Sequence, residues 1–224
     1  MCGRRKSRSW DRKPGALFIV FEGVEGSGKS TQIRLVAESL RACGIEPVVT
    51  REPGGTAAGE AIRAVALDPD LHVDAVAELL LMLAARSVFV REVVRPALAA
   101  GRVVLSDRYE LSTFAYQGGG RSLPMDKVKE LNAVATGGLR PDLCILLDVD
   151  VEHGRARGRW SATDRIEGEE RSFHERVARS YRDLARSEPD VALIEGRGEI
   201  QDVFAAVWEA LATSFPETFP PRGC

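Results

Sequence analysis

The sequence predicts an α/β fold in which a five-stranded parallel sheet carries helices on both faces. Three observations predict it: short apolar runs recur along the chain, helical patterns separate them, and a glycine-rich loop joins the first run to a helix. Alternation of this kind is typical of parallel sheets. The expected strands are Leu17–Phe21, Pro47–Thr50, Val103–Asp107, Leu143–Leu147 and Val191–Ile194.

The length and composition favour one soluble globular domain. The chain has 224 residues, of which 44% are hydrophobic, and a net charge of −2. The folded part lacks the extended basic stripe of a nucleic-acid binder, and no run approaches the roughly 18 apolar residues of a membrane span. The cysteines at positions 2, 43, 144 and 224 lack metal-ligand spacing and fit free thiols in a reducing compartment. We therefore expect a cytoplasmic protein whose partners are small polyanions.

Local composition predicts the domain boundaries. Residues 1–16 are basic and lack the apolar core of a secretory signal, so we expect a disordered tail there, with a short targeting segment as the alternative. Residues 17–214 form the expected domain. Residues 215–224, which contain three prolines, form a second loose tail.

The first expected strand leads into a phosphate-binding loop. Residues 23–30 fit the pattern G-x-x-x-x-G-K-[ST], and apolar side chains recur at helical spacing from Thr31 to Ala42. The glycines let backbone N–H groups converge on an anion, and the helix N-terminus adds positive potential. Lys29 can then reach the β- and γ-phosphates of a nucleoside triphosphate, and the Ser30 hydroxyl can bind Mg²⁺.

Polar clusters also follow the second and third expected strands. The run R-E-P-G-G-T over residues 51–56 places Arg51, which can grip a phosphate, in a segment that an ordinary turn also explains. At the next strand end, Asp107 suits a magnesium-nucleotide site and Arg108 can bridge two phosphates, with a surface ion pair as the alternative. Since ligands bind beyond the carboxyl ends of parallel strands, we expect these clusters to line one cleft.

Two helical segments carry further signals. Glu78–Leu98 is apolar nearly all round, so we expect a helix that is central or buried against a second subunit. Farther along, Arg155, Arg157 and Arg159 precede a loop-like stretch, which predicts a mobile lid over about residues 152–168. A lid that brings an arginine to the γ-phosphate would stabilise charge and exclude water. From Arg171 onward the arginines alternate with acids, as on a solvated helix face.

Together these motifs resemble thymidylate kinase. The resemblance rests on F-E-G-V-E-G-S-G-K-S-T-Q at residues 21–32, R-E-P-G-G-T at 51–56, A-R at 85–86, D-R-Y at 107–109, A-Y-Q-G-G-G at 115–120 and D-R-I-E at 164–167. It covers about residues 17 to 210. Many phosphotransferases share the first motif, but the R-E-P-G-G-T, D-R-Y and A-Y-Q-G motifs in this order are highly specific.

The resemblance implies a P-loop kinase fold, a homodimer, and Mg²⁺-dependent transfer of the γ-phosphoryl group of ATP to dTMP, giving dTDP and ADP. By analogy, Arg51 and Arg108 hold the acceptor phosphate, Arg86 hydrogen-bonds the thymine edge, and Tyr116 crowds a ribose 2′-OH. The residues implied to bind ATP are Gly23, Val24, Glu25, Gly26, Ser27, Gly28, Lys29, Ser30 and Thr31. Those implied to bind dTMP are Glu25, Arg51, Met82, Arg86, Arg108, Thr113, Tyr116 and Gln117, and the metal ligands are Ser30 and Asp107.

The expected catalytic residues are Lys29, Arg108 and one lid arginine. Some family members carry a catalytic arginine inside the phosphate loop, where this chain has Gly26. A lid arginine must then supply the cation, as in the bacterial form, and Arg157 is expected, with Arg155 and Arg159 as alternatives.

Position 82 departs from the family pattern. Family members usually place a phenylalanine there to stack on the base, whereas this chain has Met82. Methionine offers a polarizable sulfur and apolar contact, so we expect looser base selection. A kinase of another nucleoside monophosphate such as dUMP is therefore one alternative. An ATP-binding switch without phosphoryl transfer is a more distant one.

Overall fold

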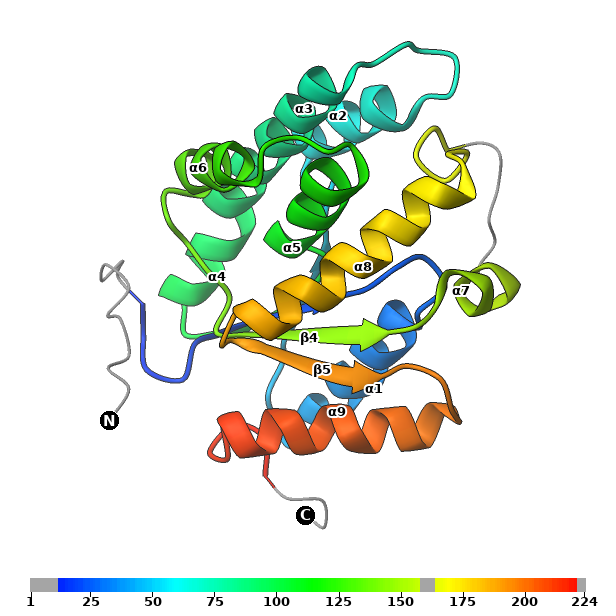
Figure 1. Cartoon of the computed structure of the whole chain (residues 1–224). Helices are drawn as coiled ribbons and strands as arrows, with labels where there is room; N and C mark the ends of the chain where they lie inside the picture. Colours follow the sequence, from blue (N-terminus) through cyan, green and yellow to red (C-terminus); the bar gives the residue numbers. More distant parts are fainter. Residues whose placement is uncertain (1–11, 158–163, 221–224) are drawn as a thin grey trace.

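The computed structural model describes residues 12–157 and 164–220, and these contain the expected five-stranded parallel sheet (Figure 1). The strands are β1 (Leu17–Glu22), β2 (Val48–Arg51), β3 (Val103–Asp107), β4 (Leu143–Asp148) and β5 (Val191–Glu195), in the order β2-β3-β1-β4-β5. Every neighbouring pair is parallel. The predicted fold class is confirmed.

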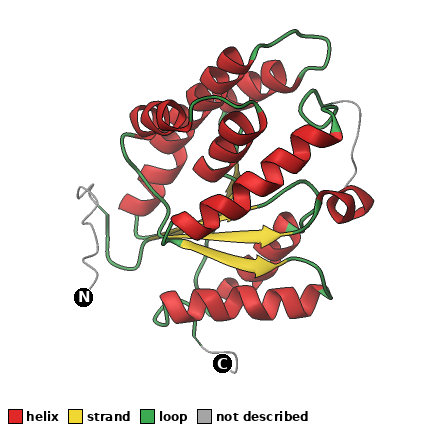
Figure 2. Ribbon diagram, viewed as in Figure 1, coloured by secondary structure: helices red, strands yellow, loops and turns green. Residues whose placement is uncertain are grey.

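Helices cover both faces of the sheet (Figures 1 and 2). One face carries α1 (Lys29–Ala42) and α9 (Ile200–Ser214). The other carries α3 (Ala75–Phe89), α4 (Arg95–Ala99), α5 (Glu110–Thr113), α6 (Met125–Thr136) and α8 (Arg171–Ser187), while α2 (Ala57–Leu67) packs on α3 and α7 (Val151–Arg157) follows β4. No helix in the described ranges is long and apolar enough to cross a membrane.

The strands are buried from both sides. In β1, Ile19 and Phe21 pack in the cluster that includes α1 and α9, whereas Phe18 and Val20 pack with helices of the opposite face. Successive side chains of a strand point to opposite faces, so an uninterrupted apolar run suits a sheet covered on both sides. Each of these four side chains is at most 1% exposed. The loops that follow the strands therefore start from fixed positions.

The long segment predicted as one helix over Glu78–Leu98 is helical, but its pitch changes. It begins earlier than predicted because Asp74 caps the first turn of α3 with its carboxylate. After α3 the chain forms a π-helix, η1 (Val90–Val94), before α4. Pro96 accounts for this change, since a proline ring clashes with the carbonyl four residues before it.

Parts of both predicted tails make specific contacts. Near the N-terminus, the Arg12 guanidinium donates to the Asp142 carboxylate, at 2.8 Å from Nη1 to Oδ1. Near the C-terminus, Phe219 is fully buried and packs edge-on against Trp208, whose indole N–H donates to the Pro220 carbonyl oxygen at 2.9 Å. An apolar ring close after the last helix can fold back on it despite the neighbouring prolines. Residues 1–11 and 221–224, from the same predicted tails, lie outside the described residues.

Candidate active site

The loop after β1 has the geometry of a phosphate cradle. Gly23, Gly26 and Gly28 have φ angles of 141°, 73° and 95°, which favour glycine. A Cβ atom on Gly23 would lie only 2.7 Å from the Leu147 carbonyl oxygen. Helix α1 then begins at Lys29 with neither a side-chain cap nor an acidic residue in its first turn. Its first backbone N–H groups are therefore available to an anion.

Lys29 is held inside this loop. Its side chain is buried, and Nζ donates to the carbonyl oxygens of Gly23 at 3.1 Å and Val24 at 3.0 Å. Burial, and then repulsion by Arg108, lowers the pKa of Lys29. Phosphate oxygens would be stronger partners for this ammonium group than neutral carbonyls, so an anion in the loop favours its charged form.

Ser30 and Asp107, the residues expected to bind a metal ion, are in contact. Ser30 Oγ donates to Asp107 Oδ2 at 3.1 Å, and Asp107 Oδ1 is buried without a hydrogen-bond partner. Hydroxyl and carboxylate oxygens suit Mg²⁺, which usually keeps waters and phosphate oxygens as its other ligands. Within residues 12–157 and 164–220, no group of three or more His, Cys, Asp or Glu side chains could hold a metal. The pair thus fits a cation that arrives with phosphates.

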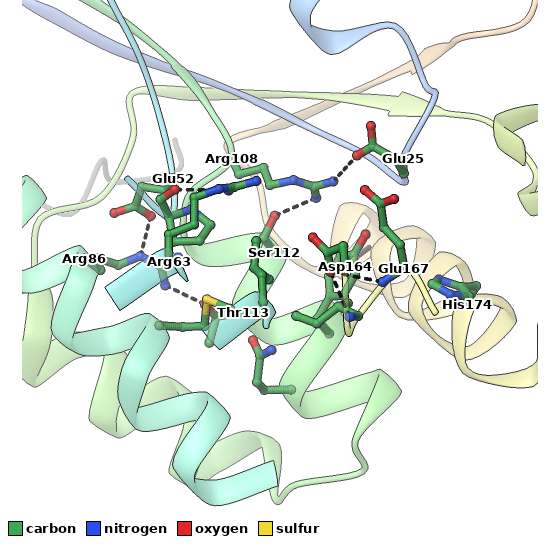
Figure 3. Close-up of a pocket in the computed structure, with 16 residues that line it drawn as sticks. Glu25, Glu52, Arg63, Arg86, Arg108, Ser112, Thr113, Asp164, Glu167 and His174 are labelled. Carbon is green, nitrogen blue, oxygen red and sulfur yellow. Dashed lines mark hydrogen bonds and ion pairs between the residues drawn. The ribbon is translucent and has the colours of Figure 1, made fainter. Parts of the chain in front are cut away.

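A cavity open to solvent lies next to the loop (Figure 3). Seven lining residues were expected from the sequence: Glu25, Met82, Arg86, Arg108, Thr113, Tyr116 and Gln117. The others are Glu52, Pro53, Arg63, Leu67, Ser112, Asp164, Ile166, Glu167 and His174. The structure therefore brings most of the predicted acceptor-binding residues into one cavity.

Arg86 forms a rigid polar point in the cavity wall. Its Nε donates to Glu52 at 2.7 Å, Nη1 donates to Thr113 at 2.7 Å and Asn132 at 2.9 Å, and Nη2 donates to the Tyr109 carbonyl oxygen at 2.8 Å. These bonds use four of the five guanidinium N–H groups. One N–H of Nη2 is left for a ligand, in a direction fixed by the other four.

Gln117 is oriented by the buried carboxylate of Glu78. Its Nε2 donates to Glu78 Oε1 at 2.8 Å, while Arg121 and Arg165 donate to Oε2 at 2.9 and 2.7 Å. Burial would raise the pKa of Glu78, but the hydrogen bonds from Arg121, Gln117 and Arg165 outweigh it and lower the pKa. An ionised carboxylate only accepts hydrogen bonds, so it fixes the amide NH₂ group of Gln117 toward itself. The amide oxygen of Gln117 is left as an acceptor for a ligand.

Arg108 lies between the phosphate loop and the cavity (Figure 3). Its Nη2 donates to Glu25 Oε2 at 3.2 Å, and Nη1 donates to the Gly23 carbonyl oxygen at 3.2 Å. Its guanidinium carbon lies 5.3 Å from the centre of the Tyr116 ring. Burial opposes its charge, but Tyr116, Tyr181, Asp107 and Glu25 outweigh burial and raise the pKa of Arg108. The side chain can contact phosphates that arrive from either side.

Arg51, expected to hold the acceptor phosphate, does not line the cavity. Its side chain is 55% exposed, and Nη2 donates to Glu60 Oε2 at 3.0 Å. Arg63 from α2 lines the cavity instead, with Nη1 donating to the Pro53 carbonyl oxygen at 3.2 Å. Burial, and then Arg51, lowers the pKa of Arg63. The cation presented to the cavity from this side is thus Arg63.

The expected lid arginine also points elsewhere. Arg157 ends α7, and its guanidinium donates to the carbonyl oxygens of Gly196 at 3.1 Å and Gly198 at 3.3 Å, both in the loop between β5 and α9. It does not line the cavity, and neither does Arg155. Arg159 and the other residues of 158–163, predicted as the tip of the lid, lie outside the described residues.

Sequence reasoning gave no role to several cavity residues. Glu52 stands in the R-E-P-G-G-T motif, in which the sequence predicts Arg51 as the functional residue. Arg63 and His174 lie on α2 and α8, where charged residues fit an ordinary solvated face. Asp164 and Glu167 belong to the D-R-I-E motif, and the structure places both in the cavity wall (Figure 3). For Asp164 and Glu167, the D-R-I-E motif could therefore have indicated a place in the site.

Known proteins are similar to this chain over most of its length. The family model described as thymidylate kinase matches residues 21–207. The chain is 48% identical over 197 residues to the thymidylate kinase of Desulfovibrio desulfuricans, covering 84% of this chain and 91% of that protein. It is also 48% identical over 211 residues to the thymidylate kinase of Desulforudis audaxviator, covering 93% of this chain and 96% of that protein.

A solved structure shows the same similarity. The crystal structure of thymidylate kinase from Ehrlichia chaffeensis matches with a TM-score of 0.74 and 31% sequence identity. The match covers 88% of this chain and 100% of that chain. Sequence and fold thus point to the same group of proteins.

The buried carboxyl group of Glu52 should make the stability of the protein depend on pH. Burial raises its pKa to about 7 from an ordinary value of 4.5, although Arg86 opposes the shift. The folded protein therefore holds this proton more tightly than the unfolded chain, and stability should fall as the pH rises from about 4.5 to about 7. In the wild type, the free energy of unfolding should be lower at pH 8 than at pH 5, and Glu52→Gln should make this difference smaller by on the order of 3 kcal/mol. Urea unfolding at the two pH values measures it.

The control for this prediction is Glu46→Gln, which changes an exposed glutamate outside the cavity. It should leave the stability difference between the two pH values as in the wild type. If the stability difference between pH 5 and pH 8 were the same in Glu52→Gln as in the wild type, the raised pKa assigned to Glu52 would be wrong.

Proposed function

We propose a function for this site from one premise: the chain belongs to the thymidylate kinase family. The activity is ATP-dependent phosphorylation of dTMP, with dTDP and ADP as products. One observation carries the assignment of the site, namely that Arg108 contacts the phosphate loop through Gly23 and Glu25 and also lines the cavity. A nucleotide in the loop and a nucleotide in the cavity would meet at this side chain.

The loop over residues 23–31 binds the phosphates of ATP. Its converging N–H groups and the uncapped start of α1 receive the phosphate oxygens, and Lys29 exchanges its carbonyl partners for them. Ser30 and Asp107 would hold Mg²⁺, which would neutralise the negative charge that develops on the phosphates. The donor nucleotide is thereby fixed on the side of the loop that faces Arg108.

The cavity binds dTMP. One N–H of Arg86 donates to a carbonyl oxygen of the base, and the amide oxygen of Gln117 accepts from the ring N–H beside it. Thymine and uracil carry this pair of groups, whereas cytosine presents a ring acceptor at the same place. Met82 supplies apolar contact, and Tyr116 lies near the sugar. Because buried polar groups left unpaired are costly, the site disfavours dCMP.

Phosphoryl transfer needs no covalent intermediate on the protein. An oxygen of the dTMP phosphate attacks the γ-phosphorus of ATP, and the bond from that phosphorus to the bridging oxygen breaks as ADP leaves. Lys29, Arg108 and Arg63 neutralise charge on the phosphates and hold them in line. Among the lid arginines that the structure describes, we assign Arg157, which contacts the loop between β5 and α9, to the donor nucleotide.

Met82 supports a second candidate, a kinase of another pyrimidine monophosphate such as dUMP. A flexible thioether shapes the cavity less sharply than an aromatic ring. Arg86 and Gln117 hydrogen-bond to groups that thymine and uracil have in common. Discrimination between dTMP and dUMP would therefore rest on contacts with the 5-methyl group alone.

We also propose a homodimer that forms through α3 and α6. Val76 and Leu80 of α3 are 56% and 52% exposed, and Leu131 and Val134 of α6 are 40% and 77% exposed. The two helices pack against each other. Exposed apolar side chains gathered on adjoining helices are typical of a protein interface.

The proposed location is the cytoplasm. Cys43 and Cys144 are free thiols, which fits a reducing compartment. Fractionation of the host cell tests this, and recovery of the protein outside the cytoplasmic fraction would contradict it.

The activity is tested by ADP release with Mg-ATP and, separately, dTMP, dUMP, dCMP or no acceptor. We expect dTMP-dependent turnover that is lost when EDTA removes the metal. Lys29→Ala should lower turnover by about two orders of magnitude or more, because a cation on the phosphates is lost, with circular dichroism unchanged. Near-normal turnover of Lys29→Ala would show that the loop is wrongly assigned.

Replacing Arg63 and replacing Arg51 should affect binding of the acceptor phosphate differently. If Arg63 contacts it, Arg63→Ala should raise the KM for dTMP about tenfold or more, since one charge-assisted hydrogen bond is lost. Arg51→Ala should change it less than about threefold, as expected for an exposed ion pair. Steady-state kinetics at saturating ATP measure both. A larger effect at Arg51 would restore the role expected from the sequence.

The dimer is tested by replacing one exposed apolar side chain of α3 with a charge. Leu80→Glu should shift the protein from dimer to monomer in sedimentation velocity, since a charge in an apolar interface is costly. Val65→Glu, at a 45% exposed position on α2, is the control. A wild-type monomer, or the same shift in both variants, would contradict the proposed surface.

A further inference from the structure

We propose that Glu22 and Tyr181 are positioning residues for Arg108 and aim its guanidinium at the phosphates. The inference rests on the proposed function, which places Arg108 on the transferring group. Glu22 and Tyr181 are buried, and neither lines the cavity. Their influence on the reaction must therefore pass through the side chain they hold.

One edge of the Arg108 guanidinium is enclosed by oxygen acceptors. The two N–H groups of Nη1 are shared among three acceptors: the Gly23 carbonyl oxygen at 3.2 Å, Ser112 Oγ at 3.2 Å and the Tyr181 hydroxyl at 3.3 Å. Nη2 has Glu25 as its partner, and the Glu25 side chain is 42% exposed. Nη1 thus anchors the group, and the Nη2 edge can engage a phosphate.

Glu22 orients the two hydroxyls that receive Nη1. Ser112 Oγ and the Tyr181 hydroxyl donate to Glu22 Oε2 at 2.6 and 2.9 Å. Oε1 of the same carboxylate accepts the backbone N–H groups of Tyr109 at 2.8 Å and Ser112 at 3.1 Å. With its hydrogen directed at the carboxylate, each hydroxyl turns a lone pair toward Arg108. The two hydroxyls also lie 2.9 Å from each other, and with the single hydrogen of each directed at Glu22, both oxygens remain acceptors for the arginine.

The backbone of Arg108 is fixed separately from its side chain. Its φ angle of 73° lies in the left-handed region, where a residue other than glycine is strained. Its N–H donates to the Phe21 carbonyl oxygen at 2.9 Å, and the Ser106 hydroxyl donates to its carbonyl oxygen at 2.9 Å. The strand ends thus hold the main chain, whereas Tyr181, on α8, acts only on the direction of the guanidinium.

The first arm of the test removes one phenol hydroxyl. Tyr181→Phe should lower kcat about five- to tenfold, because one of the three acceptors that fix the direction of Nη1 is lost, and should leave the KM for ATP within about twofold. Tyr109→Phe is the matched control, since this buried hydroxyl donates to the Leu139 carbonyl oxygen at 3.1 Å, away from Arg108. It should keep kcat within about twofold of the wild type.

The second arm is a double-mutant cycle in which calorimetry measures the Kd for dTMP. Binding can be measured even for variants that have lost activity. Tyr181→Phe should raise the Kd for dTMP about fivefold in the wild type. It should change Kd less than about twofold in the Arg108→Ala background, where no guanidinium remains to be aimed. If circular dichroism shows that Tyr181→Phe is not folded, Glu22→Gln, which also changes a residue outside the cavity lining, takes its place in the same cycle.

Two results would overturn the inference. One is equal kcat in Tyr181→Phe and Tyr109→Phe, and the other is the same loss of dTMP affinity in both backgrounds of the cycle. A wild-type protein without dTMP-dependent ADP release would overturn the proposed function instead. That activity is therefore measured first, so the two failures are distinguishable.

Discussion

The position of β3 between β1 and β2 is the constraint on which the site depends. In the parallel register, Asp107 at the end of β3 lies opposite Phe21 on one side and Arg51 on the other. The loops after these three strands therefore begin side by side. This adjacency lets Ser30 reach Asp107 and lets Arg108 reach Glu25, although more than 70 residues separate the members of each pair. Apolar strands covered on both faces hold the register that these contacts require.

Three buried carboxyl groups orient the polar side chains of the site. Glu22, Glu52 and Glu78 are at most 4% exposed, and each accepts hydrogen bonds from groups that belong to the site or hold it. Such groups cost desolvation energy, and apolar replacements are often as stable or more stable. What they supply here is orientation: Glu52 leaves Arg86 one free N–H, Glu78 turns the Gln117 amide, and Glu22 turns the hydroxyls around Arg108. In the proposed function, these three side chains orient the groups that select the acceptor and align the phosphates.

The sequence was informative where local pattern decides structure and less so where tertiary contacts decide it. The phosphate loop and the five strands follow from glycine spacing and apolar runs, which act over a few residues. Arg63 could not be distinguished from other charged residues of α2, because its place in the cavity depends on how α2 packs. The exposure of Arg51 likewise follows from its pairing with Glu60. The burial of Phe219 depends on α9, which a proline-rich end does not reveal.

The central claim is that donor and acceptor phosphates meet at Arg108, with the base against Met82, Arg86 and Gln117. A crystal structure of the protein with ADP, Mg²⁺ and dTMP bound tests it most directly. The account predicts ADP phosphates in the loop over residues 23–31, the dTMP phosphate within hydrogen-bonding distance of Arg108 and Arg63, and one N–H of Arg86 on a thymine carbonyl oxygen. A dTMP molecule bound outside the cavity, or with its phosphate held by Arg51 and away from Arg108, would contradict the account.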